Sequence, residues 1–190
     1  MMNRRDALSR VALILGGTII GSEAFLTGCK SNASVSGIPF SVETINLLNE
    51  IAETILPATN TPGAKEANVG EFMAVWVKDC YDEKDQKLFI EGINKLDEFC
   101  KTKNSKSFLE SDAKQRTDCL NELNKEQEAF QKTKKPDEPQ HYFRMIKELT
   151  LMGFFTSEIG ATKVLRYEAV PGKFIGNYPY KKGDRAWATN

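Results

Sequence analysis

The sequence has few of the residues and motifs on which enzyme sites depend. It contains a single histidine, His141, so a metal site or catalytic triad would have to find its other partners elsewhere. We expect His141 to be a surface or helix-capping residue. There is no P-loop, no G-x-S-x-G and no H-E-x-x-H, and the glycines of "GGTIIG" fail the dinucleotide-binding spacing. We therefore expect no catalytic, cofactor-binding or metal-binding residue in this chain.

An excess of charge and paired cysteine motifs are also lacking. Basic and acidic residues both number 26, so the composition gives no electrostatic reason to expect nucleic-acid binding. The four cysteines form neither C-x-x-C nor C-x-x-C-H, which excludes a zinc ribbon and covalent c-type haem in this chain. For Cys80, Cys100 and Cys119, buried thiols, a disulfide within the chain and a disulfide between chains all stay open.

The N-terminus has the order of an export signal. Basic residues precede the apolar run "VALILGGTIIGSEAFL", which is too short and too rich in glycine for a transmembrane helix. The run closes on "LTGC", in which a small residue precedes Cys29, and this is the pattern of lipoprotein processing. We expect residues 1–28 to be removed, Cys29 to carry a lipid, and residues 29–40 to be a flexible tether.

This signal predicts a lipoprotein on the periplasmic side of the cell envelope, on a membrane that the sequence does not specify. The pair Arg4-Arg5 partly resembles a twin-arginine signal, which exports folded proteins. Ala7 replaces the usual bulky residue, however, so twin-arginine and general secretory export both stay open. The mature chain remains close to neutral, so we expect contact with the membrane through the lipid on Cys29 and not through a basic patch.

Residues 41–190 predict a single all-α domain, an irregular bundle of about six helices with no strand pattern. The first helix runs from an N-cap at Ser41 to Leu56, where Pro57 ends it. The second starts near Asn68, with an apolar stripe on one side made of Phe72, Val75 and Trp76. Four further helices are expected to start at an Asp82 opening, a Ser111 cap, Pro139 at the first helical position, and a Thr156 or Ser157 cap.

Two irregular segments stand out from this helical pattern. One is a long loop containing proline and glycine, Pro57–Ala64, in which Thr61-Pro62-Gly63 is a turn-prone tripeptide. The other is an aromatic C-terminal tail, residues 168–190. Its aromatic side chains can either pack back on the body or bind a partner, and both alternatives stay open. These side chains are Phe174, Tyr178, Tyr180 and Trp187.

Three segments together resemble the gluconate 2-dehydrogenase subunit 3 family. They are "ILPATNTPGAKEANVGEFM", "LTLMGFFTSEIGATKVLRYEAVPGKFIG" and the start "NRRDAL". Their order and spacing agree with the family, whereas residues 80–135 carry little of the resemblance. A lipid anchor is not a general feature of this family, so Cys29 is a departure from it.

The resemblance implies a non-catalytic small subunit that accompanies a large FAD-containing oxidoreductase of the glucose-methanol-choline (GMC) type. A c-type cytochrome often completes such complexes, so FAD would belong to the partner subunit and haem c to a third. The small subunit would assist export, folding and membrane attachment of the flavoprotein, which would oxidise gluconate or a sugar. The alternative is a freestanding envelope lipoprotein that binds a glycan or another protein, with its aromatic tail stacking on sugar rings.

The resemblance and the irregular backbone together predict where the partner docks. We expect the loop and the segment that follows the last helix to form the contact surface. Glu158 has a structural alternative, because a carboxylate in the first turn of a helix is favoured by the helix dipole. The predicted partner-binding residues are Pro57, Thr61, Pro62, Gly63, Ala64, Glu158, Tyr167, Val170, Pro171 and Gly172.

Overall fold

Five α-helices and a short π-helix make up the part of the chain that the computed structural model describes, residues 40–170 and 172–188. Within these residues the only β pairing is an isolated bridge between Arg166 and Trp187, so the predicted all-α class is confirmed. The predicted export signal, the Cys29 lipid site, residues 29–39 of the tether and Pro171 lie outside the described residues. Phe40, the last residue of the predicted tether, is described and packs against Phe89, with ring centres 6.4 Å apart. The elements are α2 Val42–Ile55, α3 Val69–Cys80, α4 Glu83–Asn104, α5 Ala113–Thr133, α6 Tyr142–Thr156 and η1 Gly160–Val164.

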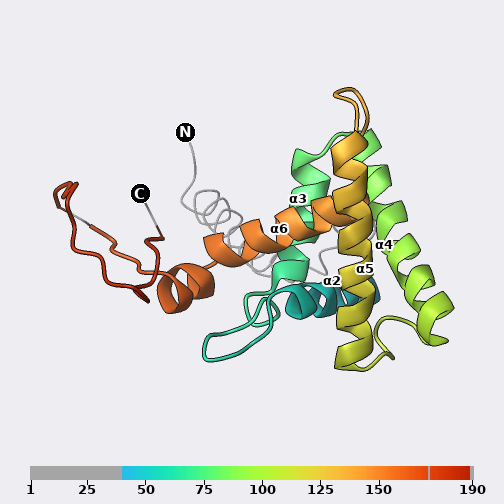
Figure 1. Ribbon diagram of the computed structural model, residues 1–190, viewed down its shortest axis with the longest axis horizontal. Coiled ribbons are helices and arrows are strands. Elements are labelled where there is room, and N and C mark those ends of the chain that lie inside the picture. The colour runs from blue at the N-terminus through green and yellow to red at the C-terminus, as the bar shows by residue number, and fades with distance from the viewer. Residues whose placement is uncertain (1–39, 171, 189–190) are drawn as a thin grey trace, which may run out of the picture. The chain divides into compact units, whose positions relative to one another are not determined.

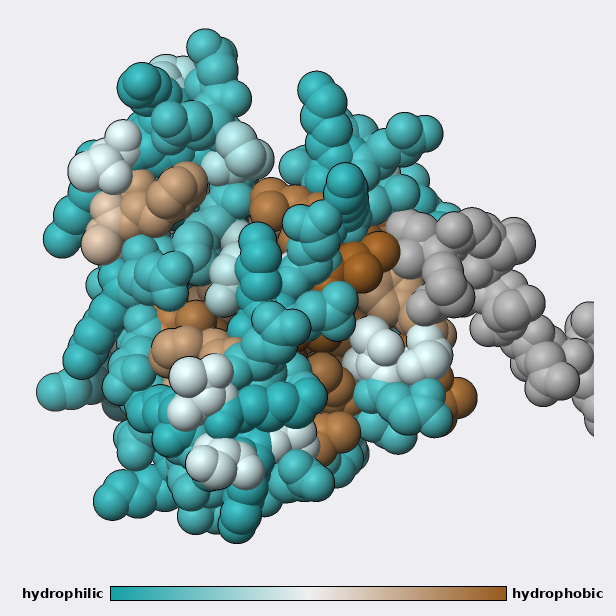
Figure 2. Space-filling view, turned by 90° about the vertical axis from the view of Figure 1, so that its right-hand side faces the viewer, coloured by the Kyte–Doolittle hydropathy of each residue, from teal (hydrophilic) through white to brown (hydrophobic). Residues whose placement is uncertain are grey.

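Helix α6 lies at the centre of the bundle. The helices α3, α4 and α5 alternate in direction along the chain, and α2 and α6 run across them (Figure 1). Helix α6 contacts every other α-helix as well as η1, and α2 packs on α3, α5 and α6. The side of the bundle that carries α4 and α5 is mostly hydrophilic, with apolar groups visible between the charged side chains (Figure 2). The core is therefore built around α6.

Polar side chains determine where the helices begin. The Ser41 hydroxyl accepts a hydrogen bond from the Thr44 N–H at 3.2 Å, and the Asp82 carboxylate accepts one from Asp85 at 2.8 Å. These bonds satisfy backbone donors that have no partner within the helix. The predicted N-cap at Ser41 and helix opening at Asp82 are thus confirmed.

Two predicted helix starts are wrong. The N-cap of α5 is Asp112 and not Ser111, because Gln115 stands three residues after Asp112 and completes a reciprocal capping box. Helix α6 begins at Tyr142, so Pro139 lies before the helix and is not its first residue. Its N-cap is His141, whose Nδ1 accepts a hydrogen bond from the Phe143 N–H at 3.2 Å. The capping role expected for His141 is confirmed.

Helix α3 has two apolar sides, of which only one is buried in the core. The predicted stripe does lie on one side of the helix, but Val75 is 50% exposed and Phe72 and Trp76 are only half-buried. The rings of Phe72 and Trp76 contact each other, with centres 5.5 Å apart. The residues that face the core are Val69, Met73, Ala74 and Val77.

Part of the aromatic tail folds back on the segment that follows η1. The Arg166 N–H donates to the Ala186 carbonyl at 2.8 Å, and the Ala188 N–H donates to the Arg166 carbonyl at 2.9 Å. The Arg166 guanidinium lies 4.6 Å from the ring centre of Trp187 and 5.6 Å from that of Tyr178. Other aromatic side chains stay exposed, namely Phe174 and Tyr180. Tyr178 and Trp187 therefore pack back on the segment after η1, whereas partner binding by Phe174 and Tyr180 stays a prediction.

Candidate docking site at the loop between α2 and α3

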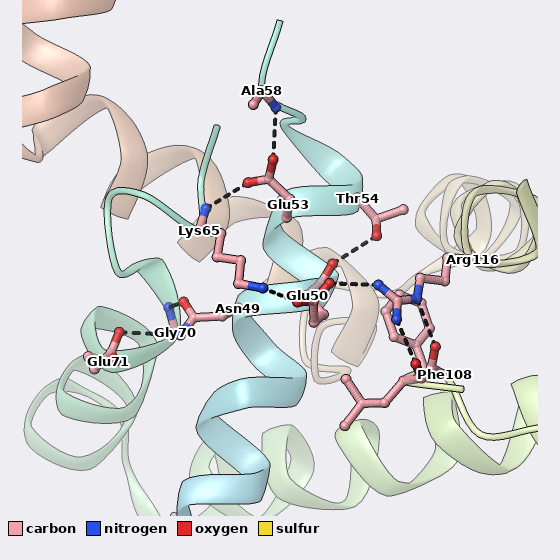
Figure 3. A network of polar contacts seen from close by, with 11 residues as sticks. Asn49, Glu50, Glu53, Thr54, Ala58, Lys65, Gly70, Glu71, Phe108 and Arg116 are labelled. Atoms are coloured by element: carbon pink, nitrogen blue, oxygen red, sulfur yellow. Dashed lines mark hydrogen bonds and ion pairs between the residues drawn. The ribbon is translucent and has the colours of Figure 1, made fainter. Parts of the chain in front are cut away.

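A single carboxylate on the last turn of α2 closes the loop that follows it. The Glu53 Oε1 accepts a hydrogen bond from the Ala58 N–H, and Oε2 accepts one from the Lys65 N–H, both at 2.8 Å (Figure 3). Ala58 and Lys65 stand near the two ends of the loop, so Glu53 joins these ends directly. Hydrogen bonds to an ionised acceptor are about twice as strong as neutral ones. We call this arrangement the Glu53 bridge.

Gly63 and Ala64 are buried inside the loop, so a partner could contact them only if the loop changed its shape, and their predicted role in docking stays a prediction. A side-chain carbon on Gly63 would lie 2.4 Å from both Glu53 carboxylate oxygens and 2.6 Å from the Ala58 nitrogen. Ala64 is fully buried, and its N–H donates to the Leu56 carbonyl at 3.0 Å. Gly63 is therefore needed for the shape of the loop, because the Glu53 bridge leaves no room for a side chain at this position.

The remaining loop residues form its accessible surface. Pro57 is exposed, whereas Thr61 and Pro62 are half-buried. The Thr59 N–H donates to the Thr61 carbonyl at 2.9 Å, which tightens the tip of the loop. A partner could therefore contact Pro57, Thr61 and Pro62 without any rearrangement of the loop.

A second carboxylate, Glu50, ties the loop to the rest of the bundle. It forms an ion pair with Lys65, and its Oε2 lies 2.6 Å from Nη1 of Arg116 on α5 (Figure 3). Arg116 also donates to the carbonyls of Phe108 at 3.0 Å and Leu109 at 2.6 Å, so its guanidinium is held from several sides. The loop, α2, α5 and the connection before α5 are thereby linked in one network.

Asn49 extends this network to the start of α3. Its Oδ1 accepts a buried hydrogen bond from the Gly70 N–H at 2.7 Å, and its Nδ2 donates to Glu71 at 3.4 Å. The Gly70 N–H belongs to the first turn of α3, where backbone donors lack partners within the helix. Three side chains of α2, those of Asn49, Glu50 and Glu53, therefore fix the loop and the helix that follows it.

The ion pairs of Glu50 predict a loss of stability in acid. Lys65 and then Arg116 hold the pKa of Glu50 below its ordinary value. A carboxylate with a depressed folded-state pKa stabilises the protein above about pH 4.3, the unfolded value, and this contribution is lost as the pH falls through the folded pKa. We expect Glu50→Gln to lower the free energy of unfolding by about 2 kcal/mol at pH 7, and by much less at pH 3.

Urea unfolding of both proteins at the two pH values tests this prediction. Glu98→Gln is the matched control, because Glu98 is an exposed residue of α4 whose side chain has no ion pair among the described residues. A difference between wild type and Glu50→Gln that is the same at both pH values would contradict the assignment.

The second predicted segment lies close to the loop. The Ser157 hydroxyl accepts from the Gly160 N–H at 2.9 Å, although the N-cap position of η1 is Ile159 and Ser157 is the C-cap of α6. Glu158 is exposed in the turn that follows Ser157. Lys163 Nζ lies 3.3 Å from Oε1 of Glu66, and this pair links η1 to the loop. The other predicted contact residues in the described part of this segment are all exposed, namely Tyr167, Val170 and Gly172.

Two of the three described cysteines are buried between helices, and the histidine caps a helix. Cys80, Cys100 and Cys119 are free, and the last two are buried. Burial, with Cys119 adjacent, raises the pKa of Cys100, so this thiol stays protonated and is a poor nucleophile. The Nδ1 atom of His141 caps the start of α6.

A metal site and a membrane span are both absent from the part of the chain that the structure describes. No cluster of histidine, cysteine and carboxylate side chains in these residues is placed to hold a metal. None of their helices combines the length and the apolar character that a membrane span requires.

Glu50 and Glu53 were not among the predicted site residues. A carboxylate in the last turn of a helix meets the negative end of the helix dipole, so it needs a compensating donor nearby. Here α2 has two acidic residues and no basic one near its C-terminus, immediately before a loop rich in backbone donors. This unfavourable placement is the signal that could have identified the Glu53 bridge.

The described residues form a small helical domain in which side chains of α2 hold the loop before α3 and apolar side chains stay exposed after η1. The family model described as Gluconate 2-dehydrogenase subunit 3 matches residues 43–172, which is more than half of the chain. The chain therefore belongs to the gluconate 2-dehydrogenase subunit 3 family, as the resemblance predicted, and this family associates it with a gluconate dehydrogenase complex. No curated protein and no solved structure matches the chain.

Proposed function

We propose that this chain is the non-catalytic accessory subunit of a GMC-type, FAD-dependent dehydrogenase that oxidises gluconate or a sugar. The observation that carries the proposal is the family match, which includes both predicted docking segments and ends at residue 172. The structure adds physical support, since the loop between α2 and α3 is held by the Glu53 bridge before any partner arrives. A loop that is already ordered loses little conformational entropy on binding, which favours its use as a docking element.

FAD and haem c are assigned to the other subunits. The sequence contains no C-x-x-C-H for covalent haem, and the described residues contain no strand that leads through a glycine-rich loop into a helix. We therefore assign neither group to this chain and derive no redox step for it.

Recovery of the chain from its native host tests the proposal. Affinity-tagged protein should bring down a large subunit with flavin absorbance, and with it turnover of a sugar acid or sugar by an artificial electron acceptor. If the chain is recovered alone and colourless, the accessory role is wrong. Turnover by the isolated chain would contradict its non-catalytic character.

Tyr167→Ala tests the docking surface itself. Tyr167 is exposed and follows η1 within the family match, and an exposed aromatic side chain often contributes much of an interface's binding energy. We expect about tenfold weaker retention of the flavoprotein, which corresponds to about 1.4 kcal/mol. Tyr180→Ala is the matched control, because Tyr180 is also exposed but lies beyond the family match. Equal retention in both variants would remove Tyr167 from the interface.

We also propose that the chain is exported and anchored to the envelope through a lipid on Cys29. The support is the sequence pattern, in which a basic start, an apolar run and "LTGC" follow one another. Labelled palmitate should be incorporated into the wild type and not into Cys29→Ser. Absence of label from the wild type would contradict the anchor.

The exposed tail favours a second candidate function, glycan binding by a freestanding lipoprotein. Phe174 is 95% exposed and Tyr180 is 75% exposed, and aromatic faces of this kind can stack on sugar rings. If the chain binds oligosaccharides without any flavoprotein, and loses this binding in Phe174→Ala, the second function replaces the first.

A further inference from the structure

The exposed side of α3 continues across to α6 as one apolar surface. The ring of Phe72 lies against Gly153 of α6, where a side-chain carbon would come within 2.5 Å of it. Trp76 lies beside Phe72, one turn further along α3. Because Gly153 has no side chain, α6 allows these aromatic rings to sit on its surface, where they remain half-buried.

A groove of about 460 Å³ opens beside Trp76, and we call it the α3–α6 groove. Its apolar lining comes from α3, α6 and the two connections next to them, and consists of Trp76, Tyr81, Pro139, Met145, Leu149 and Met152. Methionine and aromatic side chains adapt well to the shape of a bound partner. The groove is therefore suited to an apolar side chain or to the aliphatic part of a longer one.

The charged groups that line the groove are all acidic. They are Asp85, Glu138 and Glu148, and no lysine or arginine is among the described residues that line it. Arg144 pairs with Glu148 at 2.7 Å, whereas Asp85 and Glu138 have no ion-pair partner in the described part of the chain. Burial, and then the charges of Glu148 and Asp85, raise the pKa of Tyr81. A basic group entering the groove would find two carboxylates that lack a cationic partner.

We propose that the α3–α6 groove binds a basic segment of the partner polypeptide, in which an arginine or lysine is flanked by apolar residues. The aliphatic stem of the basic residue would lie on Trp76, its charged end would reach Asp85 and Glu138, and its apolar neighbours would contact the exposed Met152. A cation near the face of a tryptophan is attracted by the ring, and opposite charges orient the partner on approach. The inference deepens the proposed function, on which it rests for the existence of a partner.

The fluorescence of Trp76 reports on the groove directly. Trp187→Phe leaves Trp76 as the sole tryptophan of the full chain. The probe is a short blocked peptide that alternates leucine and arginine, and the same peptide with glutamate in place of arginine is the negative control. We expect a saturable change in fluorescence with the basic peptide alone, weakened about tenfold by Asp85→Asn combined with Glu138→Gln and also weakened by added salt. Glu98→Gln, which changes a carboxylate further along α4, should have no effect.

The outcomes separate this inference from the proposed function. No response to the basic peptide, or an equal response to the acidic one, would overturn the groove even if the flavoprotein is recovered. A Trp76 signal that depends on protein concentration and not on peptide would show that a second copy of this chain fills the groove, which also overturns it. Retention of the flavoprotein should fall about tenfold in Asp85→Lys and stay unchanged in Glu98→Lys. A saturable peptide response without any recovered flavoprotein would leave the groove standing and contradict the proposed function.

Discussion

Gly63→Ala is expected to open the loop between α2 and α3 and to lower the free energy of unfolding by about 3 kcal/mol. The added carbon would lie 2.4 Å from both carboxylate oxygens of Glu53 and 2.6 Å from a backbone nitrogen. The carboxylate must therefore move away, and the N–H groups of Ala58 and Lys65 lose their acceptor. Because these bonds join the two ends of the loop, one methyl group disrupts both of them.

Urea unfolding measures the loss of stability, and hydrogen exchange at the amides of Ala58 and Lys65 shows whether the loop has opened. Gly176→Ala is the control, because its added carbon meets only the exposed ring of Phe174. Glu53→Gln keeps the shape of the side chain but loses its charge and one acceptor, so we expect a smaller effect in the same direction. If Gly63→Ala exchanges its loop amides as slowly as the wild type, the Glu53 bridge does not hold the loop.

The predicted docking role adds a second readout for Gly63→Ala. If the loop has opened, its backbone must be ordered again when the partner binds, and this loss of conformational entropy weakens binding. The wild-type loop is ordered beforehand and does not carry this cost. We therefore expect the variant to retain less flavoprotein than Gly176→Ala at equal amounts of folded protein. Undiminished retention would exclude the loop from the interface while leaving its structural role intact.

Phe89→Ala is expected to lower the free energy of unfolding by about 4 kcal/mol. Phe89 is fully buried on α4, and its ring meets those of Phe40 and Tyr81 edge to face, with centres 6.4 and 6.5 Å apart. Truncation removes the transfer free energy of the ring and leaves a cavity between elements that are far apart in the chain. Tyr81 also lines the α3–α6 groove, so the Trp76 response to the basic peptide should weaken as well.

Phe99→Ala is the matched control on the same helix. Phe99 is only half-buried, so its truncation leaves a smaller cavity. We expect it to lower the free energy of unfolding by about half as much as Phe89→Ala does. Thermal unfolding followed by circular dichroism compares the three proteins. If Phe89→Ala and Phe99→Ala lower the free energy of unfolding equally, Phe89 is not buried in the core in the way that the structure shows.

The helices were predictable because their signals are local. Ser41 and Asp82 lie directly before runs with helical spacing, and each caps through a backbone donor three residues away. The start of α5 was misplaced by one residue because Ser111 and Asp112 are both good capping residues, and only the reciprocal bond with Gln115 distinguishes them. Pro139 was placed in α6 on its own preference, although His141 supplies the cap.

The candidate site was only partly predictable, because burial depends on residues that are distant in the chain. The loop was recognised from its composition, yet Gly63 and Ala64 were taken for surface residues. The loop folds inward because Glu53 is hydrogen-bonded to both of its ends, and the spacing of residues along the sequence does not reveal such a contact. In α3, the grouping of Phe72 with Trp76 on one side was correct, but only the packing of α6 decides that the opposite side enters the core.

The sequence by itself determined the all-α class, most helix starts, the family and the position of the irregular loop. Each of these depends on interactions within a few residues or on a motif read directly from the chain. Only the tertiary structure decided that the loop is closed by Glu53, that Glu50 ties it to Arg116, and that an acidic groove lies between α3 and α6. Each of these features depends on side chains from different helices that come into contact because the helices pack around α6. Helical periodicity in the sequence does not tell which of these side chains will be in contact.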